Sequence, residues 1–154
     1  MNSIFTKLNY KDQPIIHVLQ APESFQSAMQ EMNAITQVKT EFSSDESATF
    51  VLAFVTQQSE IDALTSLFSK ALQGDGVLWF AYPKGTSKRY KCDFNRDTGW
   101  HILGQHGFEG VRQVAIDEDW SALRFRRAEY IKTMKRAEKR AMSEIGRTKI
   151  KENE

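Results

Sequence analysis

The sequence of 154 residues has a single cysteine and no long apolar run. Cys92 has no second thiol to pair with inside the chain, and a lone thiol suits a reducing compartment. The longest apolar stretches, VLAFV and VLWFAY, fall far short of the roughly 20 residues that span a bilayer. The N-terminus also lacks the basic segment and apolar run of a secretory signal. These absences predict a cytoplasmic protein without a membrane segment.

Net charge is nearly absent as well, at +1 for the whole chain. The total conceals an uneven distribution, because residues 1–82 carry 4 Lys/Arg against 9 Asp/Glu (net −5), whereas residues 83–154 carry 17 against 11 (net +6). The overall charge therefore indicates nothing about partners, but the second half could form a basic face.

The spacing of apolar residues predicts alternating strands and helices. The run ATFVLAFV (48–55) is apolar on both faces, as expected of a central strand covered by helices on each side. Ser59 is a candidate N-cap of the next helix. The last two strands are so close in sequence that they should pair antiparallel. The predicted elements are strands at 15–20, 35–42, 48–55, 77–82, 111–116 and 122–127, and helices at 23–34, from Ser59 to Leu72, near 95–106 and at 129–146.

This order of elements predicts an α/β three-layer sandwich with a mostly parallel sheet of about six strands, Rossmann- or methyltransferase-like, with a C-terminal antiparallel hairpin and a basic C-terminal helix. We expect one domain over residues 1–146 and a polar tail over 147–154. The succession from ATFVLAFV through GDGVLWFAYP to the final hairpin resembles the later half of class I methyltransferases. That resemblance implies the fold alone.

Two segments resemble a bacterial family described as domain of unknown function 3052. They are FVTQQSEIDALTSLFSKALQGDGVLWFAYPKGTSK and VAIDEDWSALRF, within which YPKGTSK and DEDWSALRF are the most specific parts. Together they make up 47 of the 154 residues, about a third of the chain. The resemblance implies relatives with the same fold, and it implies no chemistry.

The sequence lacks the glycine-rich turn with which this fold usually binds a nucleotide cofactor. The turn after the first predicted strand is QAPE (20–23), which has no glycine and carries a carboxylate that would oppose a pyrophosphate. The glycine turn GDG (74–76) precedes a strand, so it should lie at the other edge of the sheet. We therefore predict no dinucleotide or S-adenosylmethionine cofactor.

Motifs for a metal site or a catalytic centre are incomplete. The segment DFNRD (93–97) begins like an EF-hand loop, but Thr98 and Gly104 replace the glycine and the glutamate that such a loop needs. Its Asp93 or Asn95 is better read as a helix N-cap. His101 and His106 would point about 140° apart on a helix, and we expect His17 to be a core histidine. The sequence has no P-loop, GxSxG or HExxH. We expect no metal site and lean against an enzyme.

A basic loop, KGTSKR (84–89), leaves the strand 77–82 at the edge where open α/β sheets collect ligands. Lysine charge, hydroxyls and the amides of a following helix could bind an anion there, or the loop could be a solvated connection. The acidic turn DEDW (117–120) could face this loop, with Trp120 as an apolar wall, or its acids could be turn residues and Trp120 a packed lid. The candidate ligand-binding residues are Lys84, Thr86, Ser87, Lys88, Arg89, Asp117, Asp119 and Trp120.

These observations favour a non-catalytic binding or regulatory domain with a small-anion site at this edge. A group-transfer enzyme at the same edge is the first alternative. Cys92, near Lys91 and Arg89, is either an activated thiol or an idle one. The second alternative is binding of nucleic acid or an acidic protein by the C-terminal helix, whose basic side could equally be a solvated face. Its basic residues are Lys132, Lys135, Arg136, Lys139 and Arg140.

Overall fold

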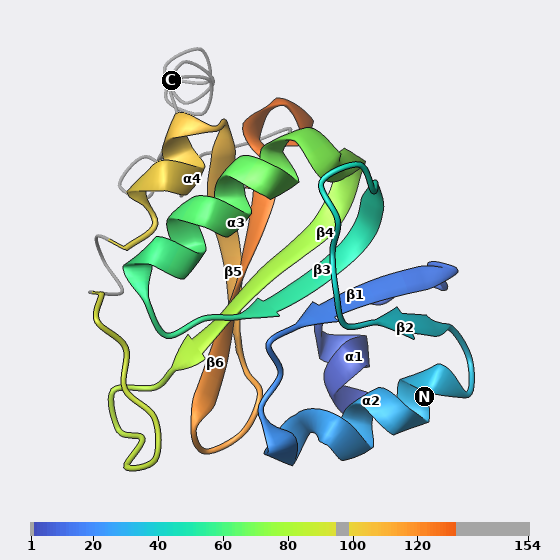
Figure 1. Ribbon diagram of the computed structural model, residues 1–154, viewed down its shortest axis with the longest axis vertical. Helices are drawn as coiled ribbons and strands as arrows, with labels where there is room; N and C mark the ends of the chain where they lie inside the picture. The colour runs from blue at the N-terminus through green and yellow to red at the C-terminus, as the bar shows by residue number, and fades with distance from the viewer. Residues whose placement is uncertain (1, 95–98, 132–154) are drawn as a thin grey trace.

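The computed structural model describes residues 2–94 and 99–131, and these form one six-stranded sheet in the order β2-β1-β3-β4-β6-β5 (Figure 1). Strands β1, β2, β3 and β4 pair in parallel, whereas β6 pairs antiparallel with β4 and with β5. The predicted mostly parallel sheet and its C-terminal antiparallel hairpin are confirmed. The strands are β1 (Ile15–Leu19), β2 (Gln37–Lys39), β3 (Ala48–Phe54), β4 (Leu72–Pro83), β5 (Phe108–Ala115) and β6 (Trp120–Arg127).

Helices cover the sheet on both faces and give it three layers (Figure 1). One apolar core joins α1 (Ser3–Lys7) and α2 (Gln26–Asn33) to the first face of the sheet. The other core joins α3 (Gln58–Ala71) and α4 (His101–Gln105) to the second face. β3 contributes to both cores, which is the physical reason for its apolar residues on both faces.

The bounds of several elements differ from the prediction. β2 has three residues where the alternation predicts eight, and β4 begins at Leu72, directly after α3, rather than at residue 77. Gly74 lies within β4 at φ +52°, a left-handed conformation that glycine adopts readily, in the stretch between Leu72 and Val77 where the register with β3 shifts. Helix α1 was not predicted, since its five residues are too few to show a helical period.

The N-cap of α3 is Gln57, so the prediction of Ser59 is wrong. A carboxylate oxygen of Glu60 accepts hydrogen bonds from the backbone N–H groups of Thr56 (2.9 Å) and Gln57 (3.0 Å). Glu60 therefore satisfies donors at the start of this helix from three residues inside it, as the glutamate of a capping box does.

Parts of the predicted C-terminal region and of the predicted helix near 95–106 lie outside the described residues. The described part of the former ends with a 3-10 turn at Ala128–Tyr130 and Ile131, and that of the latter contains α4. The basic residues proposed for partner binding, Lys132, Lys135, Arg136, Lys139 and Arg140, and the tail 147–154 are among the residues not described. None of the described helices is long and apolar enough to cross a membrane.

Candidate ligand pocket at the carboxyl edge of the sheet

The carboxyl edge of the sheet brings together two segments that are distant in sequence. β4 ends at Pro83, which pairs with Trp120, the first residue of β6. The rim loop (residues 84–94) therefore leaves the same edge at which the hairpin turn (residues 116–119) enters it. The backbone N–H of Lys84 donates a 2.8 Å hydrogen bond to the carbonyl of Asp119, so the two segments are in contact.

Ser87 organises the rim loop from the inside. Its side chain is buried, and its hydroxyl donates a 2.8 Å hydrogen bond to the carboxylate of Asp119. The same oxygen accepts hydrogen bonds from the backbone N–H groups of Arg89 and Tyr90, at 3.3 and 3.1 Å. The hydroxyl thus folds the loop back on itself and fixes it to the hairpin turn.

Asp93 fixes the far end of the rim loop to α3. Its backbone N–H donates to the carbonyl of Thr56 at 3.0 Å, and its carboxylate accepts from the backbone N–H of Gln58 at 2.6 Å. Asp93 therefore satisfies a donor at the N-terminus of α3, whereas the sequence offers it, beside Asn95, as the N-cap of the helix that follows. The loop is thus fixed at one end to the hairpin turn and at the other to the start of α3.

The hairpin turn has a structural role. The carboxylate of Asp117 accepts hydrogen bonds from the backbone N–H groups of Asp119 (2.8 Å) and Trp120 (2.9 Å), which closes the turn. The Trp120 side chain is 3% exposed and packs against Phe54 and Tyr90, with ring centroids 5.1 and 4.9 Å away. Of the two alternatives for this turn, the geometry corresponds to turn-forming acids with Trp120 as a packed lid.

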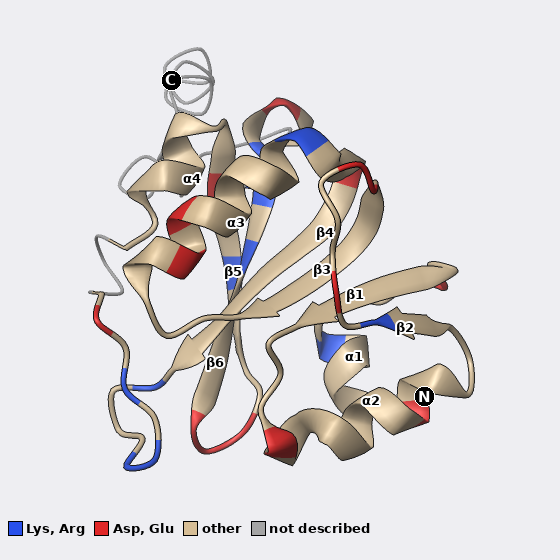
Figure 2. Ribbon diagram, viewed as in Figure 1, with Lys and Arg blue, Asp and Glu red and all other residues tan. Residues whose placement is uncertain are grey.

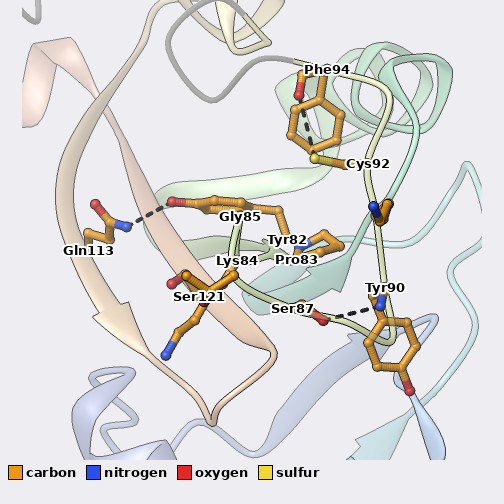
Figure 3. Close-up of a pocket in the computed structure, with 12 residues that line it drawn as sticks. Tyr82, Pro83, Lys84, Gly85, Ser87, Tyr90, Cys92, Phe94, Gln113 and Ser121 are labelled. Carbon is orange, nitrogen blue, oxygen red and sulfur yellow. Dashed lines mark hydrogen bonds between the residues drawn. The ribbon is translucent and has the colours of Figure 1, made fainter.

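A cavity of about 710 Å³ opens between the rim loop and the β4–β6–β5 part of the sheet. Figure 3 shows its walls: Gln113 lies at one side, and the rim loop with Tyr90, Cys92 and Phe94 lies at the other. This cavity, the rim pocket, is lined by Tyr82, Pro83, Lys84, Gly85, Thr86, Ser87, Tyr90, Lys91, Cys92, Phe94, Gln113 and Ser121.

The polar groups of the rim pocket are cationic or neutral. Lys84 and Lys91 line it, and no Asp or Glu is among the lining residues. The Tyr82 hydroxyl accepts a 2.8 Å hydrogen bond from the side-chain amide of Gln113, which holds the phenol in place. The thiol of Cys92 is half-buried and lies 3.4 Å from the carbonyl oxygen of Phe94, to which it donates. The pocket can thus offer positive charge, hydroxyls and aromatic faces to a ligand.

The structure brings together three of the eight predicted ligand-binding residues, since Lys84, Thr86 and Ser87 line the rim pocket. Lys88 and Arg89 belong to the same loop but do not line the pocket, and the Arg89 guanidinium lies 5.9 Å from the ring centre of Tyr90. The other three predicted residues, Asp117, Asp119 and Trp120, stabilise the loop and the turn instead of lining the pocket.

Sequence reasoning missed the residues that reach the pocket from the strands. Tyr82 pairs with Ser121 across β4 and β6, and Gln113 comes from β5 beyond them. Ser121 could be placed opposite Tyr82 only from the antiparallel register of β4 and β6, and the sequence does not fix that register. Lys91 and Phe94 were within reach of a prediction, since they lie on the rim loop itself.

The turn after β1 lies at the same edge of the sheet. Gln20 has φ +59°, a left-handed conformation, and its side-chain amide donates a 2.8 Å hydrogen bond to the carbonyl of Phe54, the last residue of β3. The side chain therefore bridges the carboxyl ends of β1 and β3. In open α/β sheets the first turn is where a glycine-rich backbone approaches a nucleotide cofactor.

His17 lies away from the rim pocket, in the middle of β1, where it is 2% exposed. Its Nε2 lies 2.9 Å from a carboxylate oxygen of Glu46, and its ring centre lies 4.7 Å from that of Phe42. The prediction of a buried core histidine corresponds to this placement. Within residues 2–94 and 99–131, no group of three or more His, Cys, Asp or Glu side chains is placed to hold a metal ion.

Comparison with known proteins identifies the fold. The sequence matches no family model and no curated protein. Three similar solved structures, with identities of 11–14%, show the fold alone. The ribosomal protein L11 methylase of Lactobacillus delbrueckii subsp. bulgaricus is 12% identical, with a TM-score of 0.51 over 80% of this chain and 76% of that one. The magnesium protoporphyrin IX methyltransferase of Synechocystis PCC 6803, with bound SAM, is 14% identical, with a TM-score of 0.50 over 80% and 74%. The pyocyanin biosynthetic protein PhzM is 11% identical, with a TM-score of 0.52 over 80% of this chain and 53% of that one. The chain has the α/β fold of Rossmann-like methyltransferases.

Proposed function

We propose that the chain binds a small organic anion in the rim pocket. The observation that carries this proposal is the make-up of the pocket wall, in which Lys84 and Lys91 occur without any lining carboxylate. A volume of about 710 Å³ is in the range of pockets for metabolites and cofactors. The location supports the proposal too, because ligands of open α/β sheets bind beyond the carboxyl ends of the strands.

The pocket also has an apolar side, which narrows the class of ligand. Tyr82, Tyr90 and Phe94 give it aromatic surface, and Pro83 adds an aliphatic one. Aromatic walls favour a flat apolar group, whereas lysines favour a phosphate or a carboxylate. We therefore propose a ligand that combines an anionic group with a planar or apolar part, in the cytoplasm predicted from the sequence.

A thermal-shift screen of phosphorylated and carboxylated aromatic metabolites tests this role. A ligand at a hundred times its Kd stabilises a protein by about 2.7 kcal/mol, which raises the melting temperature of a chain of this size by roughly 5–10 °C. Lys84→Ala with Lys91→Ala should abolish the shift, while the matched variant Lys88→Ala, on the same loop but outside the pocket, should retain it. No stabilisation of the wild type by any anion, or an equal loss in Lys88→Ala, would contradict the proposal.

Group transfer on the bound anion is the second candidate function. The comparisons favour it over a non-catalytic role, because the similar structures include methyltransferases. The volume of the rim pocket favours it as well. An acid or base would have to come from the lining residues: the phenol of Tyr82, oriented by Gln113, is the best placed, whereas Asp119 is engaged by Ser87.

The residues present do not fit S-adenosylmethionine at the turn where this fold binds its cofactor. The turn has no glycine, and the Gln20 side chain spans the ends of β1 and β3. A transferred group would therefore have to come from another kind of donor. If the anion binds but no modified product forms in cell extracts supplemented with donors of transferable groups, the function is binding alone.

We also propose that the chain is a relative of the bacterial domain of unknown function 3052. The two segments that carry the resemblance, YPKGTSK and DEDWSALRF, meet at the rim pocket: residues 82–87 of the first and Ser121 of the second line it. If the family is shared, this pocket is its common feature. Loss of anion binding by a second family member with Lys84 and Ser87 equivalents replaced would test the idea.

A further inference from the structure

Two arginines lie directly opposite each other on the outer strands of the sheet. Arg112 of β5 and Arg124 of β6 are partners in the antiparallel register, so both side chains lie on the same face. Figure 2 shows the blue segments of β5 and β6 next to each other. On the other side, Arg124 pairs with Trp79 of β4, which is fully buried. The pair therefore lies at the border between the covered and the exposed part of this face.

No carboxylate in the described residues forms an ion pair with either arginine of this pair, although like charges in directly opposite positions repel each other. The contrast with Arg126, two residues along β6, is clear. Arg126 forms a bidentate ion pair with Asp75, with its Nε 2.8 Å from one carboxylate oxygen and its Nη2 2.6 Å from the other. Glu109 also lies opposite Arg126, not opposite Arg124.

The Nε of Arg124 is an unused donor. It is buried and has no hydrogen-bond partner in the part of the chain that the structure describes. Burial of the guanidinium, followed by the positive charges of Arg126 and Arg112, lowers the pKa of Arg124, against the influence of Asp75. Among the described residues, Arg124 is thus a half-buried arginine with an unpaired donor and an exposed arginine beside it, and Asp75 offsets its charge only in part.

We propose that Arg112 and Arg124 together bind a phosphate group. A guanidinium presents a planar fork of N–H donors that matches the oxygens of a phosphate. Two guanidinium groups on adjacent strands can therefore donate hydrogen bonds to one phosphate dianion from two sides. The bound phosphate supplies both arginines with the counter-ion that no described carboxylate provides through an ion pair. Arg112 is exposed, so the site is open to solvent from the side of β5.

This phosphate site is separate from the rim pocket. Gln113, which lines the pocket, directly follows Arg112 in β5, and successive side chains of a strand point to opposite faces of the sheet, so the arginine pair and the pocket lie on different faces. The proposal does not depend on the function proposed for the pocket, and each can fail without the other.

Phosphate could come from a free metabolite or from the backbone of a nucleic acid. Residues 132–154, which follow β6 after a short turn, carry eight Lys/Arg against four Asp/Glu. An excess of positive charge in the sequence favours sequence-independent binding of a polyphosphate chain. The two sources share the same chemistry at the arginine pair, and a two-armed experiment distinguishes them.

The first arm is an NMR titration of the full ¹⁵N-labelled chain with pyrophosphate. The Nε–Hε signals of Arg112 and Arg124, assigned with Arg112→Gln and Arg124→Gln, should shift on binding. Each single substitution should weaken the affinity roughly tenfold to a hundredfold, since each removes charged hydrogen bonds. The signals should still shift in Lys84→Ala/Lys91→Ala and in Arg89→Gln, which removes an arginine of the rim loop.

The second arm measures binding of a fluorescein-labelled single-stranded RNA by anisotropy over a range of salt concentrations. If the source is a nucleic acid, Arg112→Gln/Arg124→Gln should reduce the slope of log K against log salt by about 0.7 for each phosphate that the arginines no longer neutralise. If pyrophosphate binds and this slope is unchanged, the source is a free phosphorylated molecule. Absence of arginine shifts with pyrophosphate, together with unchanged RNA binding in the double variant, would overturn the phosphate site. The amide spectrum of each variant verifies its fold.

Discussion

The hydroxyl of Ser87 donates a 2.8 Å hydrogen bond to the carboxylate of Asp119, and both side chains are buried. The bond joins the rim loop after β4 to the hairpin turn before β6, beside the backbone contact between Lys84 and Asp119. The Asp119 carboxylate therefore holds the rim loop in the shape that forms the rim pocket, and it does not line the pocket itself. The carboxylates of Asp119 and Asp117 are engaged in hydrogen bonds with the rim loop and within the turn. The two lysines that line the pocket therefore keep their positive charge although an acidic turn lies beside them.

Replacing Ser87 by alanine should destabilise the protein and loosen the pocket. The substitution leaves the Asp119 carboxylate buried without this donor, and hydrogen bonds to charged groups contribute about 1.5–3 kcal/mol. Urea denaturation of Ser87→Ala should show a loss of that size. Thr86→Ala, which removes the neighbouring exposed hydroxyl, should cost under about 0.5 kcal/mol. Equal stabilities of the two variants would show that the Ser87–Asp119 bond stabilises nothing.

The α/β fold could be predicted because its signals are local. The apolar runs of β1, β3 and β4 exist because helices cover both faces of the sheet, and the short connection before β6 forces an antiparallel pair. The bounds were less accurate, as β2 and β4 show. A strand ends where its pairing partner ends, and the partner of β2 is β1, which is distant in sequence.

The pocket could be predicted only as far as the rim loop reaches. Lys84, Thr86 and Ser87 were found because a loop at the carboxyl edge of a parallel strand is a ligand site by topology. The position of Gln113 beside Tyr82 depends on the register of the β5–β6 hairpin. The hydrogen bond by which Asp93 caps α3 joins it to Gln58, 35 positions earlier in the chain. Such tertiary contacts leave no periodic signal in a single sequence.

Glu46 should make the stability of the protein depend on pH in the acid range. The hydrogen bond with His17 lowers the pKa of Glu46 from 4.5 to about 2, with help from Ser43 and Lys39. The unfolded chain takes up this proton first as the pH falls. The contribution of Glu46 is therefore complete above about pH 5 and is lost progressively between pH 4.5 and 2.

Chemical denaturation of Glu46→Gln between pH 7 and pH 2 tests this dependence. The variant should be less stable than the wild type at pH 7, and the difference should shrink as the pH approaches 2. Glu41→Gln, an exposed carboxylate on the same segment, serves as the control. A constant difference between Glu46→Gln and the wild type across this range would exclude the lowered pKa.

Removing one arginine of the opposed pair should stabilise the protein when no phosphate is present. Arg112 and Arg124 face each other across β5 and β6, and like charges in such positions destabilise a sheet by about 0.2–1 kcal/mol. Arg112→Gln should gain a free energy of unfolding of this size at low salt, and the gain should fade as salt screens the repulsion. Arg126→Gln should instead lose stability, because it breaks the ion pair with Asp75. A loss in Arg112→Gln would mean that its charge is already compensated.

S-adenosylmethionine should not raise the melting temperature of the protein, even though the fold is that of methyltransferases. Gln20 occupies the approach to the sheet between β1 and β3 with its hydrogen bond to Phe54, and the turn that follows lacks glycine. Gln20→Gly removes that bridge but leaves Ala21 and Pro22 in the turn, so it should show no shift either. A clear stabilisation of the wild type, abolished by a substitution in this turn, would instead place a cofactor there. Such a result would raise group transfer above simple anion binding, since the rim pocket would then lie on the same edge as the donor of the transferred group.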